Sequence, residues 1–157
     1  MQVFKPPHPP RYDGRTSIFL AGTIDNGQSL DWQAALTERL RDQEVLILNP
    51  RRDAWDASWE QSIHFPLFRE QVEWEMAGLE QADIIFMYFA PGSKSPITLL
   101  ELGLTAASQK LIVCCPDGFW RKGNVEVVCH RFGLPLLEDF EAALVALNKK
   151  ILSLSVR

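Results

Sequence analysis

The chain has 157 residues, of which 46% are hydrophobic and 23% are charged, a composition typical of a single globular domain over residues 1–157. Its 16 Lys and Arg against 20 Asp and Glu leave a net charge of -4, so the basic excess that a nucleic acid polymer requires is missing. The longest apolar run, residues 84–91, is far too short for a membrane helix, and the first ten residues lack a signal peptide's apolar core. We therefore expect a cytoplasmic protein that binds neither nucleic acid polymers nor membranes.

Short apolar runs alternate with helical patterns along most of the chain. Residues 1–15 are rich in proline and without periodicity, which predicts an extended strap lying on the domain. The apolar runs suit strands that are buried on both faces of a parallel sheet. They are residues 17–21, 44–48, 83–89 and 110–115, with a fifth short candidate at 134–137.

The segments between these runs carry helical spacing. One helix is expected around Trp32, Leu36 and Leu40, and a second with Phe68, Val72, Met76 and Leu79 on its buried face. A third covers residues 96–108, with Leu99, Leu100, Gly103, Leu104 and Ala107 turned inward. A fourth starts after Asn124 and stops at Gly133, and the last covers residues 139–150. The order predicts an α/β fold: a doubly wound, flavodoxin- or Rossmann-like three-layer sandwich with a parallel sheet of about five strands.

In such folds ligands bind beyond the carboxyl ends of the strands. The loops at that edge are residues 21–25, 49–53, 90–96 and 116–124. In the first loop, Gly22, Thr23 and Asp25 are candidate substrate-binding residues, although a glycine at a strand end is also typical of a simple turn. In the second, Arg51 is a candidate ligand for a phosphate, with solvation or a salt bridge as the alternative.

Several common catalytic signatures are missing. The sequence has no G-x-G-x-x-G, Walker, H-E-x-x-H or G-x-S-x-G motif. The three histidines lie in unrelated segments, and the three cysteines have neither disulfide nor zinc spacing. We therefore expect no metal site and three cysteines that act as small buried hydrophobic residues, which leaves the carboxylates as candidate catalytic groups.

Glu75 is the first carboxylate in an unusual place. It lies three residues after Val72 and four before Leu79, on the expected apolar face of its helix. A carboxylate there is costly unless it is used or paired. The two interpretations that remain open are a catalytic group and a buried salt bridge with Arg51 or Arg52.

Glu101 is the second, near the start of the expected third helix. Thr98 and Glu101 have the spacing of a capping box, in which Glu101 would bind the helix end. A rival start with Ser95 as N-cap and Pro96 in the first helical position leaves Glu101 free. In either case we expect the helix dipole to favour the ionised form, which a nucleophile needs.

A set of motifs resembles the nucleoside 2-deoxyribosyltransferase superfamily over about residues 17–124. They are Phe-Leu-Ala-Gly-Thr at 19–23, Glu75 with Leu79, Ala-Asp at 82–83, and Ser95 six residues before Glu101 in Leu-Leu-Glu-Leu-Gly at 99–103. The resemblance implies that Glu101 attacks C1′ of the sugar to form a covalent glycosyl-enzyme. It also implies that Glu75, in place of the usual Asp, helps to protonate the base, and that Asn124 reaches into the neighbouring subunit's site.

One departure leaves the reaction open. Where the transferases carry an aspartate six residues before the nucleophile, this chain has Ser95, as do related hydrolases of 2′-deoxynucleoside 5′-monophosphates, which use a serine on the phosphate. Paired carboxyl groups suit an oxocarbenium-like transition state without metal or redox cofactor. The expected ligand is a small nucleoside or nucleotide; alternatives are an NAD-type dinucleotide glycohydrolase and a non-catalytic nucleotide sensor.

Aromatic residues predict a homo-oligomer, a dimer or larger. Trp55, Trp59, Phe65 and Trp74 fall in a loop and an early helix turn where a monomer would carry polar residues. Trp74 lies two positions from Val72 and is expected to point away from the buried stripe. Large exposed aromatics mark interfaces. A pocket shared between subunits would also agree with the role that the resemblance implies for Asn124.

Overall fold

The computed structural model describes residues 1–24 and 30–155, and in this part of the chain six parallel strands form one sheet. The strand order is β1-β3-β2-β4-β5-β6. The strands are β1 (Gln2–Phe4), β2 (Thr16–Gly22), β3 (Val45–Leu48), β4 (Ile84–Tyr88), β5 (Leu111–Cys114) and β6 (Leu136–Leu137). The sheet therefore winds outward in both directions from its middle, and the doubly wound α/β fold expected from the sequence is confirmed.

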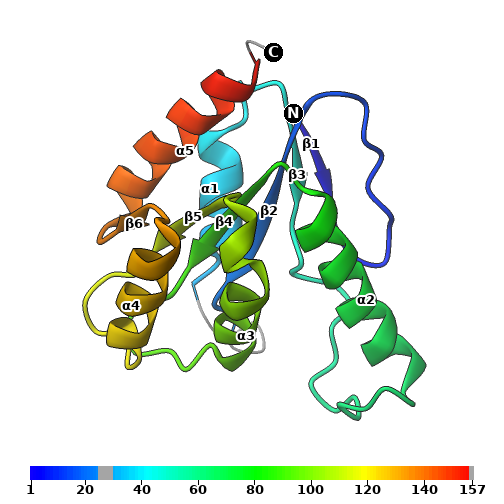
Figure 1. Ribbon diagram of the computed structural model, residues 1–157. Helices are drawn as coiled ribbons and strands as arrows, with labels where there is room; N and C mark the ends of the chain where they lie inside the picture. The colour runs from blue at the N-terminus through cyan, green and yellow to red at the C-terminus, as the bar shows by residue number, and fades with distance from the viewer. Residues whose placement is uncertain (25–29, 156–157) are drawn as a thin grey trace.

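Helices cover both faces of the sheet (Figure 1). One face carries α1 (Trp32–Arg39) and α5 (Phe140–Ser155), and the other carries α2 (Pro66–Gln81), α3 (Pro96–Thr105) and α4 (Lys122–Phe132). A short 3-10 turn, η2 (Ala106–Ser108), extends α3. Among the described residues, none of the helices combines the length and the apolar character that crossing a membrane requires.

The proline-rich segment at the start of the chain departs from the expected strap in one respect. Its residues Gln2–Phe4 form β1, which pairs in parallel with β3, with Phe4 opposite Leu48. The rest of the segment runs along α2, where the Trp74 indole donates a hydrogen bond to the His8 carbonyl at 2.8 Å. A three-residue strand is too short to show the periodicity on which its detection from sequence depends.

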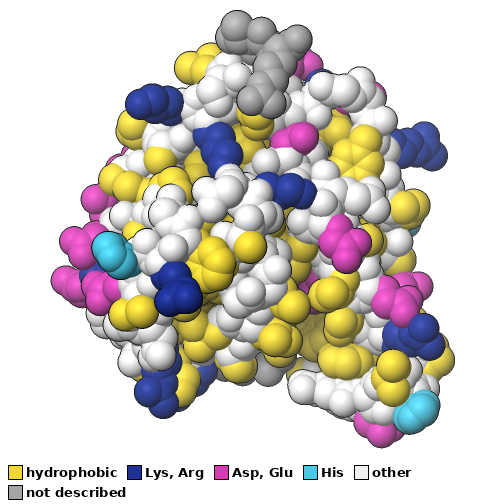
Figure 2. All heavy atoms as spheres, viewed as in Figure 1, with side chains coloured by type: hydrophobic (Ala, Val, Ile, Leu, Met, Phe, Trp, Pro, Cys, Tyr) yellow, Lys and Arg dark blue, Asp and Glu magenta, His cyan; other side chains and the backbone are white. Residues whose placement is uncertain are grey.

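The buried faces predicted for α2 and α3 were wrong at most of the named positions, although Leu79 is buried as predicted. In α2, Val72 and Met76 are exposed, and the buried residues are Gln71, Trp74, Gly78 and Leu79. In α3, Leu100 and Leu104 are each 58% exposed. The buried residues there are Thr98, Glu101, Leu102 and Thr105. Both helices bury polar side chains beside their apolar core residues and leave other apolar side chains exposed. Figure 2 shows hydrophobic side chains gathered over α3 and the side of α2 that faces it.

Close packing against β2 explains which face of α2 is buried. The Trp74 ring lies 6.1 Å from the Phe19 ring, and a Cβ on Gly78 would come within 2.7 Å of the same ring. A helix that approaches a strand this closely needs a glycine at the point of contact. Gly78 is three residues after Glu75, so this contact also fixes the height and rotation of the helix that carries the carboxylate.

The aromatic residues expected to mark an interface pack within the chain instead. Trp74 is only 9% exposed, which contradicts its predicted outward orientation. Trp55 and Trp59 meet edge to face at 5.1 Å, and Phe65 lies 6.1 Å from Trp59. The guanidinium of Arg52 lies over the Trp59 ring at 5.1 Å. This cluster gives the loop between β3 and α2 a small core of its own.

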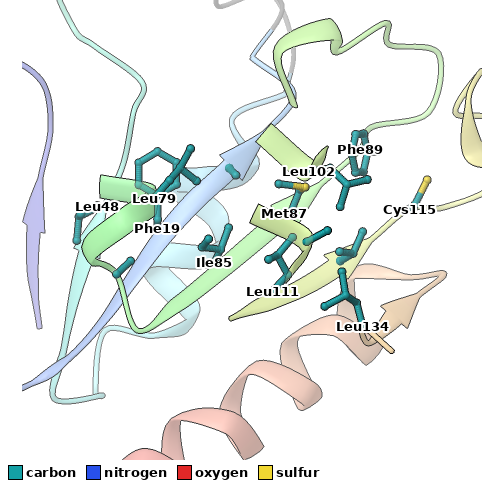
Figure 3. Close-up of a cluster of buried hydrophobic side chains, with 14 of the residues drawn as sticks. Phe19, Leu48, Leu79, Ile85, Met87, Phe89, Leu102, Leu111, Cys115 and Leu134 are labelled. Atoms are coloured by element: carbon teal, nitrogen blue, oxygen red, sulfur yellow. The ribbon is translucent and has the colours of Figure 1, made fainter. Parts of the chain in front are cut away.

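The main core lies between the sheet and the α2, α3 and α4 layer (Figure 3). A second cluster lies between the sheet and α1 with α5. The three cysteines are all buried with free thiols, as expected from the sequence. Burial raises the pKa of Cys114 to about 12 and the pKa values of Cys115 and Cys129 to about 11. These thiols act as small apolar side chains.

Candidate active site

The sheet reverses its winding direction between β2 and β4, and the carboxyl ends of these two neighbouring strands mark the switch point at which α/β proteins bind ligands. Three buried hydroxyl groups lie there. The Oγ1 of Thr23 lies 2.6 Å from the Ser95 Oγ and 3.1 Å from the Ser93 Oγ, and the two serine oxygens are 2.9 Å apart. The backbone N–H of Ala90 donates to the Thr23 Oγ1 at 2.9 Å. Two predicted site residues, Thr23 and Ser95, are therefore in direct contact.

Gly22, the last residue of β2, allows Tyr88 and Trp32 to pack closely against the end of this strand. A Cβ at Gly22 would lie 2.4 Å from the Tyr88 carbonyl and 2.8 Å from the Trp32 ring, and its φ of +150° is one that other residues rarely adopt. The indole of Trp32 also donates to the Thr23 carbonyl at 2.8 Å. The glycine is required because Tyr88 and Trp32 come close to it. The sequence suggested either a ligand contact or a simple turn for Gly22 and did not predict this packing.

The start of α3 decides whether Glu101 belongs to a capping box with Thr98 or is left free by a helix that starts after Ser95. The helix begins at Pro96, with Ser95 in the N-cap position, so the capping box with Thr98 is not formed. The Ser95 side chain does not cap the helix, since its hydroxyl is turned to Thr23 and Ser93. Its backbone is left-handed, with φ 43° and ψ 52°, a conformation uncommon for a residue with a side chain. Glu101 is thus released from any role at the helix end.

Glu75 lies on the buried side of α2 with one direct partner. The Gln71 side-chain amide donates a hydrogen bond of 2.8 Å to the Glu75 Oε1 and another of 2.9 Å to the Pro50 carbonyl. Burial raises the pKa of Glu75 to about 7, although the bond from Gln71 acts in the opposite direction. The arginines considered as partners are engaged elsewhere: Arg52 pairs with Glu70 at 2.8 Å, and Arg51 lies 3.5 Å from Asp31. The salt-bridge alternative for Glu75 is therefore wrong.

Glu101 is only 8% exposed on the inner face of α3. Burial, and then the nearby charge of Glu75, raise its pKa to about 8. This outcome corrects the expectation that the helix dipole would favour the ionised form. Glu101 is the sixth residue of α3, and the dipole's influence falls off after the first turn, so burial dominates.

The two carboxyl groups therefore form a coupled pair supplied by neighbouring helices. At neutral pH the pair holds about one proton, because the charge on one carboxylate opposes ionisation of the other. Such a pair supplies both a carboxylate and a carboxylic acid from two neighbouring helices. These are the two groups that cleavage of a glycosidic bond with a covalent intermediate requires.

The remaining predicted site residues are Arg51, Asn124 and Asp25. Arg51 follows β3 and donates to the Gln33 side-chain oxygen at 3.3 Å. Asn124 lies in the first turn of α4, which begins three residues before the expected start, and it lines a groove of about 350 Å³ between α3 and α4. This groove contains neither Glu75 nor Glu101. Asp25 lies outside the described residues.

Two residues of the site were not singled out from the sequence. Gln71 is joined to Glu75, and its position four residues earlier on the same helix is the signal that would have found it. Ser93 is joined to Thr23 and Ser95, and only its place in the loop after β4 pointed to it. Neutral amides and hydroxyls carry no charge or motif that separates them from ordinary surface residues.

A doubly wound α/β fold with a cluster of buried hydroxyl groups at the switch point and two buried carboxyl groups on neighbouring helices is typical of proteins that bind small molecules. The family model "Nucleoside 2-deoxyribosyltransferase like" matches residues 15–119. The chain belongs to this family, and the resemblance noted in the sequence is confirmed. Among curated proteins, none matches the chain significantly.

A comparison with solved structures supports the fold. The chain is similar to a structure described as a conserved protein from Enterococcus faecalis V583, with a TM-score of 0.62 and 13% sequence identity. The match covers 88% of this chain and 98% of that chain. At this identity the similarity establishes the shared architecture.

Proposed function

We propose that this protein cleaves or exchanges the N-glycosidic bond of a nucleoside, a deoxynucleoside or the corresponding 5′-monophosphate. The observation that carries the proposal is the pair of Glu75 and Glu101, presented by the neighbouring helices α2 and α3, in which the charge of Glu75 opposes ionisation of Glu101. Membership of a family named for action on nucleosides supports the same reaction class.

In the first half-reaction, an oxygen of ionised Glu101 bonds to C1′ while the bond between C1′ and the base nitrogen breaks. Protonated Glu75 delivers its proton to the departing base and becomes a carboxylate. In the second, water or an acceptor base attacks C1′, its proton passes to Glu75, and the bond to Glu101 breaks. The sugar keeps its original configuration because it is inverted twice.

The protonation of the carboxyl pair bears on this scheme. The amide of Gln71 makes Glu75 the stronger acid of the pair, whereas the reaction starts from ionised Glu101 and protonated Glu75. Both arrangements hold one proton and therefore depend on pH in the same way. The reactive arrangement is thus present wherever the pair is singly protonated, and bound substrate selects it.

Ser95 and Asn124 complete the proposal. Ser95 contacts an oxygen of the substrate, the 5′-phosphate in the monophosphate case, from the start of α3. Asn124, which lies away from the carboxyl pair of its own chain, acts in the pocket of a second copy of the protein. The protein is therefore a homo-oligomer with a shared pocket.

A base-release screen tests the proposal. Nucleosides, deoxynucleosides, their 5′-monophosphates and NAD are incubated with the protein, with and without an acceptor base, and free base is measured by chromatography. Base release from a nucleoside or monophosphate supports the proposal, and a new nucleoside formed with the acceptor identifies transfer. Release of nicotinamide from NAD alone, or tight binding of nucleotides without any release, would contradict it and favour a dinucleotide glycohydrolase or a nucleotide sensor.

A further inference from the structure

Gln71 is a buried amide whose two contacts leave it a single orientation. It is 4% exposed, and its nitrogen Nε2 contacts both the Pro50 carbonyl and the Glu75 Oε1. A backbone carbonyl can only accept a hydrogen bond, so the NH₂ group must face Pro50. The reversed amide would turn its oxygen toward two other acceptors. The same group therefore always presents its second N–H to Glu75.

This orientation constrains the proton on Glu75. While Oε1 accepts from Gln71, the oxygen that can carry the titrating proton and still donate it is Oε2. When Glu75 gives up this proton, the bond from Gln71 becomes a bond to a carboxylate and grows stronger. The hydrogen bond from Gln71 is stronger after Glu75 has lost its proton than before, so it lowers the free energy needed for proton transfer from Glu75.

We propose that Gln71 is a positioning residue for Glu75, which fixes the side chain of the general acid and keeps its proton on Oε2, the oxygen available to the departing base. The role of Glu75 as general acid rests on the proposed function. The effect of Gln71 on the proton of Glu75 does not depend on it. Glu101, on α3, is the titratable group whose charge couples to Glu75, while Arg51 and Arg52, after β3, face Asp31 and Glu70.

The decisive experiment is an NMR titration of the protein without ligand. The side-chain carboxyl carbons of glutamate and the side-chain amide groups of glutamine are followed from pH 5 to pH 10. We expect the Gln71 NH₂ signals to shift with the same midpoint as the Glu75 carboxyl. The matched reference is Gln33, a fully buried glutamine whose NH₂ has no partner among the described residues and which should not follow Glu75.

Gln71→Met removes the donor while keeping the length of the side chain, and Gln33→Met is the matched variant for loss of a buried amide. We expect Gln71→Met to raise the titration midpoint of Glu75 by about one pH unit, because a hydrogen bond to the charged form is lost. Gln33→Met should leave this midpoint in place. The same comparison is repeated in proteins that carry Glu101→Gln, where Glu75 titrates without the charge of Glu101.

Base release supplies a second readout. In Gln71→Met, the lower limb of the pH profile should move to higher pH together with the Glu75 midpoint, whereas a merely structural loss would lower activity at all pH values alike. An unmoved Glu75 midpoint in Gln71→Met, or Gln71 signals that ignore the Glu75 titration, would overturn the inference. The wild-type titration decides the matter even if Gln71→Met does not fold. A wild-type protein that releases no base refutes the proposed function, and the titration still decides whether Gln71 controls Glu75.

Discussion

Glu101 is the residue on which the proposed reaction depends most directly. Glu101→Gln should lower base release by more than about a thousandfold, since a neutral amide does not attack C1′. The assay is chromatographic measurement of free base, with folding checked by circular dichroism.

The pH dependence of the free energy of unfolding distinguishes a catalytic role of Glu101 from a structural one. The folded pKa of Glu101, about 8, lies above that of an unfolded glutamate, so the folded chain holds a proton that the unfolded chain releases above pH 5. Stability from this group is complete at low pH and is lost as pH rises towards 8, by about 1.4 kcal/mol per pH unit. Glu101→Gln should remove this slope and melt no lower than the wild type at pH 8. Retained activity per folded molecule would contradict the nucleophile role.

The coupled pair predicts the pH dependence of the reaction. Full protonation removes the nucleophile and full ionisation removes the acid, so activity should follow the singly protonated pair. With pKa values of about 7 and about 8 for Glu75 and Glu101, kcat/KM should form a bell with its maximum between these values. Glu75→Gln should abolish the bell along with most of the activity. A profile that is flat from pH 6 to pH 9 would exclude the pair as the source of the acid and the nucleophile.

At the scale of the elements, the start of α3 controls which substrates bind. With Ser95 in the N-cap position and its hydroxyl held by Thr23, we expect 5′-monophosphates to compete better than nucleosides. Ser95→Ala should reduce this preference by about tenfold, the value of a hydrogen bond to a charged group. Ser93→Ala, in the same hydroxyl cluster, is the matched control and should weaken both ligands alike. Equal competition by nucleosides and monophosphates would leave Ser95 without a phosphate role.

Two glycines in neighbouring helices provide a matched test of how α2 is positioned. A Cβ at Gly78 would meet the Phe19 ring at 2.7 Å, whereas a Cβ at Gly103 in α3 meets nothing within 4 Å. Gly78→Ala should lower the free energy of unfolding by about 1–3 kcal/mol and reduce activity by displacing Glu75. Gly103→Ala should be neutral or stabilising by up to about 1 kcal/mol. Denaturant titrations measure both, and equal effects would show that α2 has room to move.

Strands were more predictable than helix faces, because the helices α2 and α3 turn polar residues of the candidate site inward. The strands β2 to β5 are buried on both faces, so each appears as an unbroken apolar run. Predicting helix faces assumes that apolar side chains turn inward. In α2 and α3 some inward positions are occupied by Gln71, Glu75 and Glu101, and apolar residues such as Leu100 lie outside. The carboxyl pair was recognisable because a charge within an apolar pattern is unusual, whereas its amide partner gave no such signal.

For the molecule as a whole, the outward apolar side chains of α2 and α3 replace the aromatic cluster as the proposed contact between copies. Val72 and Met76 on α2 and Ile97, Leu100 and Leu104 on α3 are all exposed. They belong to the two helices that carry the carboxyl pair, and the α3–α4 groove that holds Asn124 adjoins them. A second copy on this surface would cover the apolar side chains and bring an Asn124 to the other chain's pocket.

Sedimentation and mixing experiments test this assembly. We expect a homo-oligomer at micromolar concentration, and Leu100→Lys should shift it towards a monomer with reduced activity, because a buried lysine without a partner is costly. Lys149→Ala, on the distant helix α5, controls for a change of surface charge. A wild-type monomer with full turnover would refute the shared pocket.

Mixing inactive Glu101→Ala chains with inactive Asn124→Ala chains tests the shared pocket itself. Recovered activity is expected, because one hybrid site would draw both intact residues from different chains. No recovery in oligomers proven to exchange subunits would place Asn124 outside the neighbour's pocket.

The three buried thiols have a consequence for observing this molecule in motion. Cys114 ends β5, the strand next to the edge strand β6, Cys115 follows it, and Cys129 lies in α4. Their raised pKa values keep them un-ionised at neutral pH, so an alkylating reagent meets no reactive thiolate in the closed protein. Reaction therefore requires an opening that admits both water and reagent. The rate at which each thiol is alkylated therefore reports how often the protein opens locally, at β5 in the sheet and at α4 in the helical layer.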